Sequence, residues 1–220
     1  IWFRYRMHSN YQVVVQTVSM QRDLKQSLGL DALVLPFLPQ PNTRNPGAET
    51  NNNVGKFDFV YVSSAEPHKN HATLLDAWVM LAEKGVRPSL ALTVSEESAA
   101  HIAQLIEQKK ALHGLNISNL GTLKHGEVQA LYCKSKALIF PSKLESFGLP
   151  LLEAGQHGLP VLAPELDYVR DVIEPCQTFD PNSPVSIARA VLRHLNISTP
   201  KTELLEAREF LARIEQMGRP

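Results

Sequence analysis

The chain has 220 residues, of which 44% are hydrophobic and 20% are charged, and this composition is that of an ordinary globular protein. Lys plus Arg and Asp plus Glu both total 22. No overall charge therefore attracts the chain to nucleic acid or anionic lipid, and any anion must be bound at a local site. No apolar run approaches the roughly 20 residues of a membrane-spanning helix.

The two cysteines, Cys133 and Cys176, are too few for a disulfide scaffold and form no Cys-x-x-Cys pair typical of zinc sites. We therefore expect reduced, mostly buried thiols. Residues 1–10 lack the apolar core of a signal peptide. Because there is no initiator Met, we expect the chain to begin inside a longer protein.

The first part of the chain, residues 1–38, has the pattern of one αβ unit. After a helix end we expect a strand over 11–16, a helix over 19–28 that starts at Ser19 and stops at Gly29, and a strand over 32–36. Residues 39–56 are rich in Pro, Asn and Gly and have no apolar period. This composition predicts a linker or mobile loop.

From residue 57 onward, apolar runs alternate with helical periods. We expect strands over 57–62, 89–94, 116–121, 137–140, 158–163 and 177–179. We expect helices over 71–84, 96–112, 126–134, from 149, near Tyr168, and over 184–195. Such alternation predicts an α/β fold with a doubly wound parallel sheet over 57–197. The remaining residues, 198–220, hold a trailing helix over 202–216.

The segment LESFGLPLLE follows the expected strand 137–140. Its loop should deliver Glu145, Ser146, Phe147 and Gly148 to the carboxyl edge of the sheet, where ligands bind in such folds. The next helix should begin at Leu149, and its first N–H groups would suit a phosphate.

Glu153 falls one turn inside that helix, where its carboxylate could accept hydrogen bonds from a vicinal diol. An alternative is that both acids, Glu145 and Glu153, only complement the dipole of a packed helix.

A second segment, SSAEPHKNH, follows the first strand of the domain. Lys69 at this sheet edge could neutralise a diphosphate as a point charge, or it could be a solvated lysine in a turn. His68 and His71 stand across a loop without the acid geometry of a metal site, so we expect no metal there. The chain also lacks Gly-x-Gly-x-x-Gly, Walker A, Gly-x-Ser-x-Gly and Asp-x-Asp motifs. A nucleotide would therefore be held mainly without a carboxylate-bound metal.

Together these segments resemble a known family. YVSSAEPHKNHATLLDAW, and Pro-Ser-x-x-Glu-Ser-Phe-Gly-Leu-Pro-x-x-Glu-Ala followed by Gly-x-Pro-Val, are similar to the nucleotide-sugar-binding half of group 1 retaining glycosyltransferases of the GT-B fold. The similarity runs in order over about 57–195. It implies two facing Rossmann-like domains, with a nucleotide-diphosphate sugar as donor substrate and no cofactor.

The resemblance also implies roles for individual residues. Glu145 would contact the donor sugar, Glu153 the ribose hydroxyls, and Lys69 the leaving diphosphate. It implies retention of anomeric configuration, with the leaving phosphate helping to deprotonate the acceptor. Glu145 would then orient the donor and would not act as a base. Further donor contacts would come from Ser146, Phe147, Gly148 and Leu149.

The family cradles the base where Leu123 and His125 lie, although these residues could equally be a strand end and a helix cap. Tyr132, Phe140 and Trp78 have the spacing of core aromatics, and Cys133 that of a packing residue.

One position departs from the family pattern. The family usually has Gly-Arg where this chain has Ser63-Ser64. Ser64 could donate a neutral hydrogen bond while Lys69 acts alone, or Arg170 or Lys143 could supply the missing charge, or the enzyme could be weak.

The resemblance extends to the ends of the chain. Residues 1–38 are similar to the last αβ unit of the acceptor-binding domain, and 202–216 to a tail helix that returns to it. We therefore expect a saccharide or lipid-linked acceptor to bind through that missing domain, and little transfer by this chain alone. The resemblance to this family predicts a cytoplasmic enzyme of polysaccharide biosynthesis that associates peripherally with the inner face of the membrane. The alternatives are a sugar-nucleotide 2-epimerase of the same fold and a degenerate binding module.

Overall fold

The computed structural model describes residues 12–37, 55–198 and 205–217. Its main body is a six-stranded sheet in the order β5-β4-β3-β6-β7-β8, and every neighbouring pair is parallel. The strands are β3 (Phe57–Tyr61), β4 (Leu90–Leu92), β5 (Ile117–Asn119), β6 (Ser135–Ile139), β7 (Val161–Pro164) and β8 (Gln177–Phe179). This topology confirms the predicted doubly wound parallel sheet.

The strand order reverses between β3 and β6. The chain builds outward from β3 to β5 and then returns to place β6 on the other side of β3. The loops that leave the carboxyl ends of β3 and β6 therefore diverge, and ligands bind in the crevice that forms at such a point.

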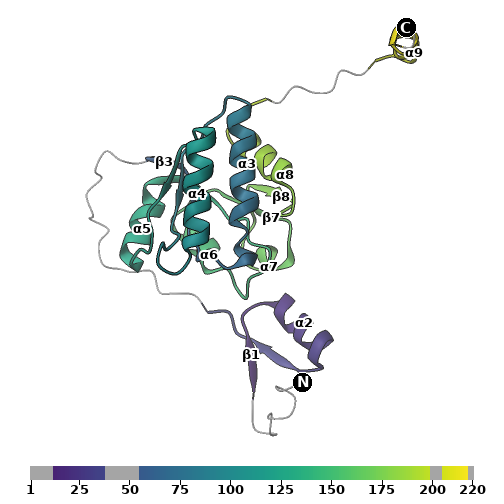
Figure 1. The fold of residues 1–220 in the computed structure, drawn as a ribbon. Helices are drawn as coiled ribbons and strands as arrows, with labels where there is room; N and C mark the ends of the chain where they lie inside the picture. Colours follow the sequence, from purple (N-terminus) through teal and green to yellow (C-terminus); the bar gives the residue numbers. More distant parts are fainter. Residues whose placement is uncertain (1–11, 38–54, 199–204, 218–220) are drawn as a thin grey trace.

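Helices cover both faces of the sheet (Figure 1). α3 (His71–Glu83) packs against α4 (Ala100–His113) and α8 (Pro184–His194) on one face. α5 (His125–Cys133) and α6 (Leu149–Gln156) pack on the other, as right-handed crossovers require. The short helices η1 (Pro67–Lys69) and α7 (Asp167–Arg170) belong to loops at the carboxyl edge.

The core lies between the sheet and these two helical layers. The central strand β3 is buried on both sides, and its Phe59 meets Trp78 edge to face with ring centroids 5.7 Å apart. Tyr61 makes the same kind of contact with Phe140, also at 5.7 Å. Trp78, Phe140 and Tyr132 are at most 1% exposed, which confirms their prediction as core residues.

The N-terminal unit consists of β1 (Val13–Val15), α2 (Val18–Leu28) and β2 (Ala32–Val34), with the two strands parallel. The predicted helix start at Ser19 is wrong by one residue, because the Oγ1 of Thr17 caps the helix by accepting the N–H of Met20 at 3.2 Å. Ser19 instead donates its N–H and its hydroxyl to Asp171, at 2.8 and 2.5 Å. The unit is thus fastened to the main body. The predicted stop at Gly29 is confirmed.

Two other helices begin later than predicted. α4 starts at Ala100 and not at residue 96, because Ser95 accepts the N–H of Ser98 and holds a turn there. The last helix, α9 (Ala207–Met217), begins after residue 202, and residues 202–204 lie outside the described ranges. Most of the predicted linker and the N-terminal helix end lie outside them too.

The prediction of mostly buried thiols is wrong, since Cys133 and Cys176 are both exposed. Cys133 ends α5 on its outer side, and Cys176 precedes the edge strand β8. Each sulfur lies beside a histidine Nδ1, at 3.6 Å for His157 and 3.8 Å for His194.

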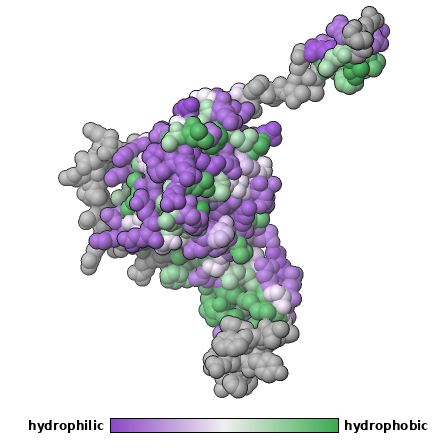
Figure 2. All heavy atoms as spheres, in the orientation of Figure 1, coloured by the Kyte–Doolittle hydropathy of each residue, from purple (hydrophilic) through white to green (hydrophobic). Residues whose placement is uncertain are grey.

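Apolar surface gathers on the N-terminal unit (Figure 2). There Val14, Leu33, Leu35 and Phe37 are each about half exposed. α9 is amphipathic, and none of its side chains is buried. No helix among the described residues is both long and apolar enough to cross a lipid bilayer.

Candidate functional site

A buried asparagine joins the loops at the carboxyl edge of the sheet. Asn70 has a left-handed backbone with φ of 64° and is only 6% exposed. Its Nδ2 donates to the carbonyls of Pro141, at 3.1 Å, and Pro181, at 2.6 Å. The loop after β3 is thereby held against the loops after β6 and β8. The N–H of Lys143 adds a bond of 2.8 Å to the carbonyl of His68.

This arrangement brings Lys69 and Glu145 into direct contact. The Nζ of Lys69 donates to both carboxylate oxygens of Glu145, at 2.7 and 2.9 Å. The two side chains are only 16% and 10% exposed, so the pair is largely shielded from water. Tyr61 fixes the backbone of Lys69 by donating its hydroxyl to the Lys69 carbonyl at 2.8 Å. The two residues predicted to be catalytic thus form one part-buried ion pair, and the alternative of a solvated lysine in a turn is wrong.

α6 begins at Leu149 as predicted, with Pro150 in its first turn. Gly148 stands before it with φ of 77°, and a Cβ at that position would lie 2.9 Å from the Leu151 Cδ1. Only glycine therefore fits this bend without strain. Phe147 is 6% exposed and anchors the loop in the core.

Glu153 lies one turn inside α6, and a tyrosine holds it in place. Its Oε2 accepts the hydroxyl of Tyr132 on α5 at 2.9 Å. Burial, reinforced by the charge of Glu153, raises the pKa of Tyr132. The phenol therefore keeps its proton and acts as the donor.

A cavity of about 500 Å³ opens at the carboxyl ends of β3 and β4, between the loop after β3 and the first turns of α5 and α6. We call it the switch-point cavity. Six of the predicted site residues line it, which brings together positions 89 residues apart in the chain (64 to 153). They are Ser64, Lys69, Leu123, His125, Leu149 and Glu153.

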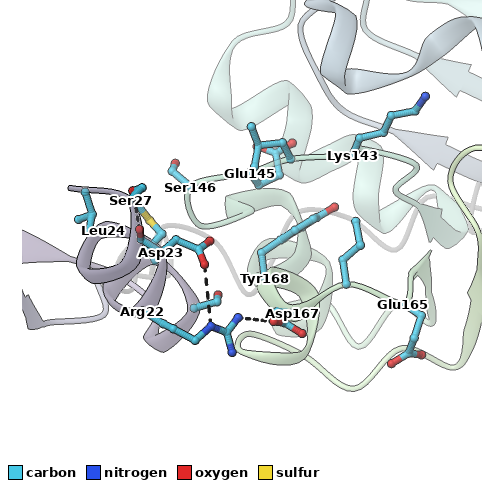
Figure 3. A pocket seen from close by; sticks show the side chains of 14 residues that line it. Arg22, Asp23, Leu24, Ser27, Lys143, Glu145, Ser146, Glu165, Asp167 and Tyr168 are labelled. Atoms are coloured by element: carbon cyan, nitrogen blue, oxygen red, sulfur yellow. Dashed lines mark hydrogen bonds and ion pairs between the residues drawn. The ribbon is translucent and has the colours of Figure 1, made fainter. Parts of the chain in front are cut away.

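A second cavity, of about 620 Å³, lies between α2 and the main body (Figure 3). Glu145 and Ser146 line it and do not line the switch-point cavity. An ion pair between Arg22 and Asp167 crosses one side of this second cavity. Glu145 lines this second cavity and its partner Lys69 lines the switch-point cavity. The ion pair between Lys69 and Glu145 therefore stands between the two cavities.

The structure shows which side chains could replace the arginine that the family usually has at the position of Ser64. Its hydroxyl donates to the carboxylate of Glu66 and lowers the pKa of that acid. Arg170 is paired with Glu165 and Glu174, and neither Arg170 nor Lys143 lines the switch-point cavity. Among the described residues, Lys69 is the only Lys or Arg that does.

The buried side chain of His71 contacts the Ser63-Ser64 turn. Its Nε2 lies 2.8 Å from the Ser64 carbonyl and 3.1 Å from the Ser63 hydroxyl, and its buried Nδ1 has no hydrogen-bond partner among the described residues. Burial lowers the pKa of His71, although the bond to Ser64 and the charge of Glu66 act the other way. His71 is therefore neutral in the folded protein near pH 7.

This lowered pKa predicts a pH dependence of stability. In the unfolded chain His71 takes up a proton near pH 6.5. In the folded protein burial keeps His71 neutral to a lower pH. Stability should thus be complete above about pH 6.5 and fall below it, by at most about 1.4 kcal/mol per pH unit. Urea unfolding at pH 7.5 and 5.5 measures this effect, and His71→Gln should flatten the dependence. An equal dependence in the variant would contradict it. Burial also lowers the pKa of His194. Because His194 is present in both the wild type and the variant, it contributes the same pH dependence to each.

No three His, Cys, Asp or Glu side chains gather into a possible metal site within the ranges that the structure describes. Metal independence itself remains a prediction. His68 and His71 lie at opposite ends of a turn, and His71 is buried behind it.

Three residues of the site carry polar roles that the sequence did not reveal. The sequence predicts Tyr132 as a core residue and a short helix near Tyr168, and it assigns no role to Asn70. The hydroxyl of Tyr168 donates to the Ser142 carbonyl at 2.7 Å and so steadies the loop before Glu145. The one available signal was an Asn directly after Lys69, because Asn tolerates the left-handed conformation.

Comparisons with known proteins identify the family of the chain. The chain is 34% identical over 142 residues to the serotype-specific mannosyltransferase WbdA of Escherichia coli, a match that covers 60% of this chain and 16% of that protein. It is 28% identical over 138 residues to the O-antigen chain mannosyltransferase B of Escherichia coli, covering 62% and 36%. The chain therefore spans well under half the length of these relatives.

Among solved structures, Anabaena Alr3699/HepE in complex with UDP and glucose matches with a TM-score of 0.67 and 18% identity, over 84% of this chain and 53% of that one. At this identity the match shows the fold, which is GT-B. A family model described as glycosyl transferases group 1 matches residues 44–209. Since that match covers more than half of the sequence, the chain belongs to the group 1 glycosyltransferase family.

Proposed function

We propose that the switch-point cavity binds a nucleotide-diphosphate sugar, and that the protein transfers the sugar to a saccharide or lipid-linked acceptor with retention and without a metal. The observation that carries this proposal is the convergence of Lys69, Glu153 and the N-terminus of α6 on one cavity. A cation and helix N–H groups suit a diphosphate, and a carboxylate suits the ribose diol.

The geometry supports a distinct role for each group. Glu153 would accept the ribose hydroxyls, and Leu123 and His125 would lie along the base at the other wall. Lys69 and the first N–H groups of α6 would hold the diphosphate. Glu145 would orient the sugar, since its carboxylate stands between the two cavities.

Transfer develops negative charge on the leaving diphosphate as the bond from the anomeric carbon to the phosphate oxygen breaks. The ammonium of Lys69 opposes this charge in a site largely shielded from water. An acceptor hydroxyl that attacks from the same face gives its proton to the leaving phosphate and forms the new glycosidic bond, with configuration retained. Both oxygens of Glu145 are bonded to Lys69, which favours an orienting role over that of a base.

The relatives suggest the sugar and the kind of product. Two of them are named mannosyltransferases, and one of these is assigned to the O-antigen chain. We therefore propose mannose as the transferred sugar and a surface polysaccharide as the product. The proposed reaction places the protein at the inner face of the membrane, where nucleotide sugars are available.

One observation favours a second candidate, a degenerate module that binds nucleotide sugar without transferring it. Where the family has an arginine, Ser64 is paired with the acidic Glu66. Among the described residues, Lys69 is then the one Lys or Arg in the switch-point cavity for a diphosphate. Nucleotide binding combined with an absence of mannose transfer by the full-length protein would support the module.

Calorimetry with UDP, GDP and ADP, each free and as its sugar conjugate, tests the donor site. We expect saturable binding of one nucleotide series. Glu153→Ala should weaken it at least about tenfold, because a hydrogen bond to a charged group is lost with each ribose hydroxyl. Glu83→Ala, an exposed acid at the end of α3, is the matched control and should bind as the wild type does. No saturable binding by the folded chain would contradict the proposal.

A further inference from the structure

The contact between Tyr132 and Glu153 has the geometry of a positioning device for the ribose site. Tyr132 is 0% exposed and does not line the switch-point cavity, but its hydroxyl lies 2.9 Å from the Oε2 of Glu153. Glu153 itself is partly exposed and lines that cavity. A rigid, fully buried donor therefore holds one oxygen of a flexible acid at the wall of the cavity.

The surroundings keep the tyrosine in a single orientation. Its ring packs against the ring of His157, with centroids 5.6 Å apart and the planes inclined by 37°. His157 is in turn bonded to Gln129 on α5 through Nε2, at 2.5 Å. The buried phenol ring thus packs against His157, and its hydroxyl donates to Glu153.

A carboxylate has two oxygens and about four sites that can accept hydrogen bonds. Tyr132 occupies one site on Oε2 and leaves Oε1 to the cavity. A free glutamate would sample several rotamers and would lose that freedom on binding. Because Tyr132 has already selected one rotamer, the oxygens that remain are in place before a diol arrives.

We propose that Tyr132 is a positioning residue that orients Glu153 for the two hydroxyls of a ribose, and thereby sets the preference for ribonucleotides over deoxyribonucleotides. This inference rests on the proposed function, because it assigns the ribose to Glu153. Tyr132 does not touch the nucleotide itself. Its pKa, raised chiefly by burial, keeps the phenol protonated over the whole physiological range.

The test uses Tyr132→Phe in the full chain, which removes the hydroxyl and keeps the ring. Calorimetry compares each nucleoside diphosphate that binds with its 2′-deoxy counterpart. We expect the wild type to prefer the ribonucleotide about tenfold, as for one hydrogen bond to a charged group. Tyr132→Phe should weaken the ribonucleotide toward the deoxy value while leaving the deoxynucleotide nearly unchanged.

Glu153→Asp gives a second route that leaves the core untouched. Shortening the side chain by one methylene prevents the carboxylate from reaching both Tyr132 and a ribose, so the same loss of preference is expected. In a Glu153→Ala background, Tyr132→Phe should have no further effect on affinity. A merely structural role for Tyr132 would change affinity for both nucleotides equally and would not depend on Glu153.

The outcomes separate two failures. A folded wild type that binds no nucleotide overturns the proposed function and this inference with it. A wild type that binds ribonucleotide and deoxynucleotide equally, or a Tyr132→Phe variant that keeps the full preference, overturns the inference alone. If Tyr132→Phe does not fold, Glu153→Asp decides, and an unchanged preference in that variant likewise overturns the inference.

Discussion

Replacing Lys69 by methionine is expected to lower the free energy of unfolding by about 3 kcal/mol, because it leaves a carboxylate without its partner in a shielded site. Glu145 is only 10% exposed and both of its oxygens are bonded to Lys69. The same change should remove measurable binding of nucleoside diphosphate, since the switch-point cavity has no other Lys or Arg among the described residues. Urea unfolding and calorimetry measure the two effects.

The double replacement Lys69→Met and Glu145→Leu separates stability from binding. It removes both charges, so most of the lost stability should return while nucleotide binding stays absent. Lys136→Met is the matched control, because Lys136 is paired with Asp58 at the surface, with 58% and 27% of the side chains exposed. Such a pair contributes at most about 1 kcal/mol. Unchanged nucleotide affinity in Lys69→Met would show that the diphosphate binds elsewhere.

Gly148→Ala is expected to destabilise the protein by about 2 kcal/mol, since a left-handed backbone is unfavourable for alanine and costs about 1–2 kcal/mol by itself. At φ of 77° the added Cβ would also lie 2.9 Å from the Leu151 Cδ1. The bend before α6 must therefore shift. That shift would displace the first N–H groups of the helix and weaken nucleotide binding.

Gly158→Ala provides the control for Gly148→Ala. Gly158 has a similar φ of 67°, but a Cβ there meets nothing within 4 Å, and it follows the C-terminal end of α6, away from the first N–H groups of that helix. This variant should show only the backbone cost and should bind nucleotide normally. Equal stability and equal binding in both variants would contradict the role assigned to Gly148. Thermal unfolding and calorimetry measure both quantities.

Much of the fold was accessible from the sequence, because alternating apolar runs and helical periods have few compact arrangements. The start of α6 is an example. A glycine and a proline on either side of Leu149 mark a helix N-terminus after a strand, and the structure has its first turn there. The same reasoning placed Glu145 on the loop and Glu153 inside the helix.

Other features depend on contacts between distant segments, which local patterns do not encode. Asn70 bonds to carbonyls 71 and 111 residues further along the chain. Tyr132 has the spacing of a core aromatic, and it is one, but its hydroxyl meets a residue of the site. The starts of α2 and α4 were misplaced because several Ser and Thr residues compete to cap or turn the chain locally.

A crystal structure with a bound nucleotide sugar tests the central claim most directly. The ribose should lie against Glu153 and the diphosphate between Lys69 and the first turn of α6, with the sugar directed toward Glu145. A nucleotide bound elsewhere on the protein, with the switch-point cavity occupied only by water, would contradict this account.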